Sequence, residues 1–200
     1  MPTFRGSDGA QLHYDDLHRG DGDPVPHLVD APSDAEELID TRRGERAFGA
    51  ALAAWAAGPE ATDDAAFNAW QARVAPLGYA AWGATEQAHA AIGWVSFAAN
   101  RAYFSVDPPQ DLAARLGGVT APVLVVAGAR DCVTGVAPVL ALAKLFAAGE
   151  AVMIERCGHH PWVEQPAAFR QAVDRFLGRE VRERVVEPGS TGSLSARPQR

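Results

Sequence analysis

Two residue types that cooperate in acid–base catalysis follow neighbouring apolar runs in the second half of the chain. Asp131 comes after the run 122–127, and His159 comes after the run 151–154. A histidine can act as a general base near neutral pH, and an aspartate beside it can orient the ring and stabilise the imidazolium. Each residue also has an ordinary interpretation: Asp131 as a polar turn residue that caps the next helix, and His159 as a structural or solvated loop residue.

The elements around these two residues follow an alternating α/β pattern. Both apolar runs are short and bounded by turn residues, which is typical of strands buried on both faces. Helices are expected over 136–148 and over 166–177, with Gly178 ending the second. Strands separated by helices pair in parallel, and the carboxyl ends of parallel strands line the edge where ligands bind. We therefore expect Asp131 and His159 to lie at one edge of a sheet.

The preceding part of the chain predicts a hairpin followed by helices. Phe4, Leu12 and Tyr14 flank an Asp8-Gly9 turn signal, while Pro26 demotes 25–29 to an edge strand or loop. Alanine-rich sequence then predicts helices over 34–57, 62–75 and 83–101. Four tryptophans at helical spacing are expected in the core of these helices: Trp55, Trp70, Trp82 and Trp94.

The C-terminal motifs resemble a known family. The stretches APVLVVAGARD and MIERCGHHPWVEQPAAF look like the C-terminal third of the α/β-hydrolase fold, in which an aspartate and a histidine complete a Ser–Asp–His triad. The resemblance implies that Asp131 is the acid and His159 the base, and Glu164 with Pro166 matches the E-x-P that follows. FRGSDGAQLHYDDL and GDGDPV are similar to the opening hairpin of the family. DAEELIDTRRGERAF and APLGYAAW resemble the helical cap of proline iminopeptidase-like members, so the likeness covers most of 4–178.

The sequence also departs from the family in its nucleophile. Neither G-x-S-x-G nor its cysteine version occurs in the printed sequence, and the His-Gly pair of the oxyanion-hole segment is missing. Ser33, in Ala31-Pro-Ser-Asp-Ala35, is a weak candidate nucleophile because it precedes a helix. The alternative is a capping box with Glu36, in which the Ser33 hydroxyl accepts a helix N–H. We expect an α/β fold: an incomplete α/β-hydrolase-like parallel sheet with a helical cap.

The expected organisation is an N-terminal core hairpin over 1–32, the helical cap over 33–105, the C-terminal part of the core over 106–178 and a disordered tail over 179–200. Loss of the central strands predicts marginal stability or reliance on a partner. An internal deletion or a misassembled reading frame would give the same sequence pattern.

Composition narrows the classes of partner. The 200 residues carry a net charge of −7 and a pI near 5.3, which argues against nucleic-acid or anionic-membrane surfaces. No apolar run is long enough for a membrane span and no secretory signal is visible, so we expect a cytoplasmic protein. Cys132 and Cys157 are expected to be buried thiols. His159, His160, Asp131 and Cys157 have no recognised metal-ligand spacing, so neither a metal nor a cofactor is expected.

These observations leave several functions open. In the first, the ancestral activity is hydrolysis of a small ester or an N-terminal peptide bond, and only Asp131 and His159 of the triad remain, so activity is weak or lost. In the second, Ser33 or a partner supplies the nucleophile. In the third, the chain is a non-catalytic module that binds small molecules or protein. The resembled aminopeptidases hold the free amine of the substrate with acidic cap residues; Glu36, Glu37 and Glu45 are candidates, with a solvated helix face as the alternative.

Overall fold

The computed structural model describes residues 3–5, 11–13, 32–59, 61–105 and 109–186. The first two segments are short strands, β1 (Thr3–Arg5) and β2 (Gln11–His13), paired antiparallel with Phe4 opposite Leu12. This confirms the predicted hairpin pairing. The Asp8-Gly9 turn, Tyr14 and the 25–29 segment lie outside the described residues.

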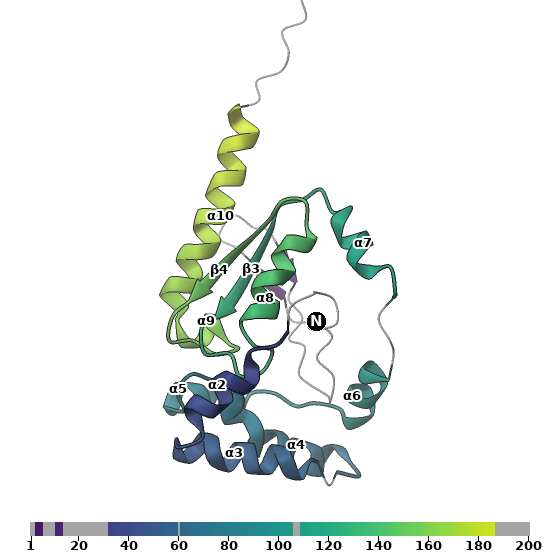
Figure 1. The fold of residues 1–200 in the computed structure, drawn as a ribbon, viewed down its shortest axis with the longest axis vertical. Helices are drawn as coiled ribbons and strands as arrows, with labels where there is room; N and C mark the ends of the chain where they lie inside the picture. The colour runs from purple at the N-terminus through teal and green to yellow at the C-terminus, as the bar shows by residue number, and fades with distance from the viewer. Residues whose placement is uncertain (1–2, 6–10, 14–31, 60, 106–108, 187–200) are drawn as a thin grey trace, which may run out of the picture.

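Four of the helices, α2 to α5, gather at one end of the molecule (Figure 1). They are α2 (Ala35–Arg42), α3 (Arg46–Ala57), α4 (Asp64–Val74) and α5 (Ala84–Ala90), and α6 (Phe97–Phe104) follows. A short 3₁₀ helix (Ala75–Gly78) connects α4 to the segment before α5. The expected single helix over 34–57 is divided, because the chain turns at 43–45 beside Gly44, a poor helix former, and restarts with Glu45 as N-cap. The expected helix over 83–101 is divided around Gly93.

Helices α3 and α4 pack against each other through an apolar core. Phe48 of α3 and Phe67 of α4 are both fully buried, and Trp70 donates a hydrogen bond from its indole N–H to the Ala54 carbonyl at 3.1 Å. Trp55 stacks on Trp70 with ring centroids 5.5 Å apart. The prediction of a tryptophan core is wrong for Trp94, which is 68% exposed, because the segment after α5 leaves the helix bundle instead of continuing the helical face.

The second half of the chain forms a parallel strand pair with helices packed on it (Figure 1). Strand β3 (Val123–Gly128) runs parallel to β4 (Gly149–Ile154) in a register that places Val123 opposite Gly149. The helices that contact the strands are α8 (Ala137–Leu142), α9 (Pro161–Glu164) and α10 (Pro166–Val186). Helix α7 (Leu112–Gly117) contacts the 3₁₀ turn (Ala143–Leu145) that follows α8. Both strands and their parallel pairing confirm the pattern in the sequence.

Two expectations about this half are wrong. Strand β4 is not buried on both faces: Ala151 is exposed and Met153 is 46% exposed, because no described element covers that face. The last helix does not end at Gly178, so 179–186 is helix and not tail. Nothing lies within 4 Å of a Cβ built at Gly178, so the helix passes through it at the modest cost of an exposed glycine. An ion pair between Arg179 and Glu150 of β4 supports the continuation.

The last residues of the expected tail, 187–200, lie outside the described part of the chain. None of the described helices is both long and apolar enough to cross a membrane.

Candidate active site

The loops after β3 and β4 are held side by side by backbone hydrogen bonds. Arg130 N–H donates to the Cys157 carbonyl at 2.8 Å, and Ala129 N–H donates to the Ile154 carbonyl at 2.9 Å. Gly128 allows this close approach, because a Cβ there would lie 1.9 Å from the Gly158 carbonyl oxygen. The two loops therefore bring Asp131 and His159 to the same edge of the strand pair, as the alternating pattern predicts.

Asp131 and His159 form a side-chain hydrogen bond. The Nδ1 atom of His159 lies 2.9 Å from Oδ2 of Asp131, whose residue is only 4% exposed. Thr134 donates its hydroxyl to the same Oδ2 at 2.7 Å, and Val133 N–H donates to Oδ1 at 2.8 Å. Burial opposes ionisation of Asp131, but the hydrogen bond and charge of His159, with the Thr134 and Val133 bonds, lower the pKa below its usual range. The arrangement is an ionised aspartate that orients an imidazole.

The turn interpretation of Asp131 is correct in part. Its Oδ1 accepts the N–H groups of Val133 and Thr134, so it does shape its own turn. It does not cap the next helix: the N–H groups of Val136 and Ala137 at the start of α8 donate to Asp34 Oδ1, at 2.7 and 3.0 Å. Because Asp34 comes from the opposite half of the chain, sequence proximity could not reveal this cap.

The backbone of His159 is fixed by the segment that follows α4. His159 N–H donates to the Gly78 carbonyl at 2.8 Å. The neighbouring His160 is buried with its ring 4.5 Å from that of Tyr79, and a Cβ at Gly78 would lie 3.2 Å from its Nε2. The His159 side chain remains 25% exposed. The imidazole is therefore partly exposed while the backbone of His159 is held in place.

Glu164 explains the E-x-P match in structural terms. Its Oε1 accepts the N–H of Gly158 at 2.8 Å, and its Oε2 accepts the N–H of Ala80. Burial raises the pKa of Glu164 above its usual value even though these backbone bonds favour the carboxylate. Glu164 thus joins the loop after β4, which carries His159 and is called the histidine loop below, to the segment 78–80. Its carboxylate holds the backbone of both segments.

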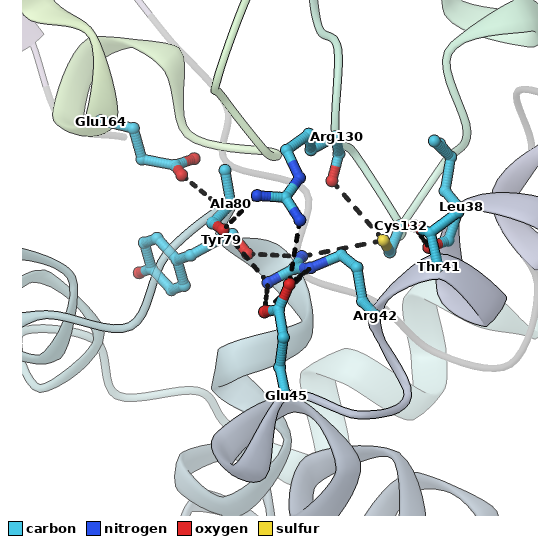
Figure 2. Close-up of polar contacts among 9 residues, drawn as sticks. All are labelled: Leu38, Thr41, Arg42, Glu45, Tyr79, Ala80, Arg130, Cys132 and Glu164. Carbon is cyan, nitrogen blue, oxygen red and sulfur yellow. Dashed lines mark hydrogen bonds and ion pairs between the residues drawn. The ribbon is translucent and has the colours of Figure 1, made fainter.

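A buried arginine of α2 also binds the segment 78–80 (Figure 2). Arg42, only 2% exposed, donates to the carbonyls of Tyr79 at 2.8 Å and Ala80 at 3.2 Å, and its guanidinium lies 4.2 Å from the Phe48 ring centroid. It pairs with Glu45 at 2.9 Å. Burial works against the Arg42 charge, but the hydrogen bonds and charges of Glu45 and Cys132 outweigh it and raise the pKa. No motif in the sequence indicates Arg42.

The acidic cap residues have separate roles. Glu45 is bound by Arg42 and, at 2.9 Å, by Arg130, so its carboxylate is already paired (Figure 2). These two arginines lower its pKa, with the Arg42 hydrogen bond as the largest cause. Glu36 and Glu37 are exposed on α2. A solvated helix face therefore describes Glu36 and Glu37, and an intramolecular ion pair describes Glu45.

Ser33 is engaged with backbone atoms. Its Oγ donates to the Thr134 carbonyl and accepts from Ala35 N–H, both at 3.2 Å. The Ser33 hydroxyl thus accepts a helix N–H, as the capping alternative predicts, but the N-cap is Asp34 because α2 begins one residue later than expected, and no described hydrogen bond joins Glu36 to Ser33. No hydrogen bond between Ser33 and His159 is present among the described residues.

The two cysteines are buried thiols, as expected. Cys157 is 0% exposed, and burial, with the charges of Glu164 and Asp131, raises the pKa of its thiol to about 12. Burial also raises the pKa of Cys132, although Arg42 acts in the opposite direction. No group of histidine, cysteine or acidic side chains suited to a metal ion occurs in the described part of the chain.

Comparison with known proteins gives a family match over part of the chain and similar solved structures. Residues 93–184 match the model of a family described as TAP-like protein, an α/β-hydrolase family. A solved structure from Burkholderia cenocepacia, assigned as an aryl esterase, superposes with a TM-score of 0.51 at 23% identity, over 61% of this chain and 46% of that chain. A bacterial membrane phospholipase A described as a virulence factor gives 0.46 at 21% identity, over 76% of this chain and 45% of that chain. No curated protein matches the chain.

The fold is therefore a partial α/β-hydrolase fold, an incomplete parallel sheet with helices at one end, as the sequence predicts. The similarity to the TAP-like family is confined to residues 93–184, which include β3, β4, Asp131 and His159. The chain spans less than half of the length of either solved structure.

Proposed function

We propose that this chain carries the acid and base of a Ser–Asp–His hydrolase, with His159 as general base and Asp131 as its orienting acid. The Asp131–His159 pair, 2.9 Å apart with the aspartate buried, carries this proposal. Val133 and Thr134 donate hydrogen bonds to both carboxylate oxygens of Asp131, and these bonds hold the carboxylate in one orientation toward the His159 ring. A fixed carboxylate at Nδ1 leaves Nε2 as the atom that would take a proton from a nucleophile.

The reaction that we propose is hydrolysis of a small ester or an N-terminal peptide, as in proline iminopeptidase-like members of the superfamily. The printed sequence has no nucleophile elbow, and Ser33 is bonded to backbone atoms. We therefore expect the isolated chain to have little or no turnover, since loss of a triad serine costs about a million-fold in kcat.

The tautomer of His159 tests the pair without relying on turnover. Nitrogen-15 NMR of the purified chain at pH 8 should show His159 protonated on Nδ1, assigned with a His159→Gln variant. Asp131→Asn should remove this preference, and Asp174→Asn on exposed α10 provides the control. A neutral His159 protonated on Nε2 in the unmodified chain would refute the proposed pair.

Turnover is then measured with chromogenic short-chain esters and with proline and alanine arylamides. We expect no His159-dependent rate. Activity that both Ser33→Ala and His159→Ala abolish would make Ser33 the nucleophile and overturn the proposal that the chain lacks one.

A non-catalytic binding module is the second candidate. It is favoured by a cavity of about 490 Å³ that His159 lines together with cap residues, which is in the size range of small-molecule sites.

A further inference from the structure

A groove runs between α4 and the segment after α5, and His159 is part of its wall. We call it the α4 groove; its volume is about 490 Å³. The residues that line it include Trp55, Asn68, Ala69, Ala72, Trp94 and His159. Because Val133 and His159 come from the two core loops, the groove reaches the Asp131–His159 pair.

Small and aromatic side chains form the groove walls. Ala65, Ala69 and Ala72 lie four and three positions apart and so share one face of α4. Trp55 is partly buried, whereas Trp94 is 68% exposed although it lines the groove. An exposed tryptophan and a face of alanines give the groove an open and largely apolar lining.

Two neutral amide side chains line the groove, and the amide of Asn68 is already hydrogen-bonded. Asn68 accepts from Val95 N–H at 2.9 Å and donates to the Val95 carbonyl at 2.8 Å, which ties the segment after α5 to α4. Gln71 adds a second amide. Among the described lining residues none is acidic, and the acidic cap residues Glu36, Glu37 and Glu45 do not line the groove.

We propose that the α4 groove is the subsite for an uncharged, flat apolar group of an ester, and that it discriminates against a substrate with a free amine. This inference rests on the proposed function and chooses the ester over the N-terminal peptide. An ammonium placed between alanines and tryptophans would lose hydration without gaining a carboxylate, whereas an aryl or alkyl group would gain contacts with both tryptophans.

Binding of two isosteric probes tests the subsite. 4-Phenyl-2-butanone is an unreactive analogue of benzyl acetate, and 4-phenylbutan-2-amine replaces its carbonyl with an ammonium at pH 7. Quenching of tryptophan fluorescence by each probe is titrated on the full chain, with calorimetry as a second readout. We expect the ketone to bind at least about tenfold more tightly than the amine.

A matched pair of variants locates the binding. Ala69→Phe places a ring in the groove and should weaken ketone binding at least about tenfold, because it fills the space. Ala56→Phe, on an exposed position of α3 outside the groove, should leave binding within about twofold. Circular dichroism establishes that both variants are folded; should Ala69→Phe fail to fold, Ala72→Leu takes its place.

The outcomes separate this inference from the proposed function. Equal or tighter binding of the amine, or ketone binding unaffected by Ala69→Phe, would overturn the subsite while the His159 tautomer stands. The wrong tautomer with ketone binding intact would refute the proposed triad pair and leave a binding groove.

Discussion

Replacement of Arg42 by methionine should destabilise the protein strongly, because this one side chain joins α2 to the segment that holds the histidine loop. Methionine keeps a similar unbranched stem and removes the guanidinium. The Tyr79 carbonyl would lose its donor at 2.8 Å, while the Ala80 carbonyl would keep Arg130 at 3.3 Å. Phe48 would lose the cation 4.2 Å from its ring, and Glu45 would lose one of two arginines.

The magnitude follows from these contacts. Loss of a charged donor to a buried carbonyl costs about 1–3 kcal/mol. A desolvated cation–π contact is worth about 1–2 kcal/mol. Glu45 is 43% exposed, so its pairing contributes only about 0.5–1 kcal/mol. Together these contributions give about 2.5–6 kcal/mol, and we expect a loss of about 3–5 kcal/mol in the free energy of unfolding, the range that applies when one partner of a buried pair is removed.

Urea unfolding followed by circular dichroism measures this loss, with Arg43→Met as the control. Arg43 is adjacent in sequence, but its ion pair with Asp40 is exposed, at 56% and 61% for the two side chains. The control should therefore lose no more than about 1 kcal/mol. For a chain of this size, a 3–5 kcal/mol loss corresponds to a fall in Tm of roughly 6–20 °C. Equal effects of the two substitutions, or a loss below about 1 kcal/mol for Arg42→Met, would refute the reasoning.

Three further predictions concern Gly178 in α10, Asp131 and Cys157. Gly178→Ala should stabilise the chain by about 0.5–1 kcal/mol in urea unfolding, because α10 continues through an open position there; a loss of stability would show that the helix ends at Gly178. The pKa of Asp131 is lowered in the folded chain, so its stabilising contribution is complete above its unfolded pKa of about 3.9 and disappears as the pH falls through the lower folded pKa. The stability difference between the unmodified chain and Asp131→Asn should therefore shrink as the pH falls below about 4, whereas a difference that persists unchanged at pH 3 would contradict the assignment. With a pKa of about 12, Cys157 is thiolate at pH 8 only to about one part in 10⁴, so Ellman's reagent should label it at least about a hundredfold more slowly in the native chain than in urea; rapid native labelling would contradict its burial.

Local sequence predicts that Asp131 and His159 lie close together. Asp131 and His159 each follow an apolar run, and parallel pairing of two such runs necessarily brings their ends together. The sequence does not predict the contacts that hold these two residues in place. Asp34 caps α8 from 102 positions away, and Arg42 reaches Tyr79 from 37 positions away. Neither contact leaves a local pattern, because side chains that meet across a fold need no fixed spacing in sequence.

The ends of the helices also depended on tertiary packing and not on local sequence alone. Gly44 and Gly178 are both glycines within helical sequence, yet the chain turns beside Gly44 and continues as helix through Gly178. A glycine costs a helix only about 1 kcal/mol, so the surrounding packing decides the outcome. At Gly44 the chain turns between α2, which carries the inward-pointing Arg42, and α3, which carries the buried Phe48; at Gly178 an exposed helix continues toward the Arg179–Glu150 ion pair.

The sequence by itself determined the hairpin strands, β3 and β4, the order of helices and strands, and the two chemical groups at the strand ends, because these depend on apolar runs and turn residues within a few positions. Only the tertiary structure decided that Asp131 is buried and ionised, that Glu45 belongs to Arg42 and Arg130, and that Trp94 lines a groove instead of a core. Burial, pKa and the shape of a cavity are set by what surrounds a residue, and those surroundings exist only after distant segments have packed together.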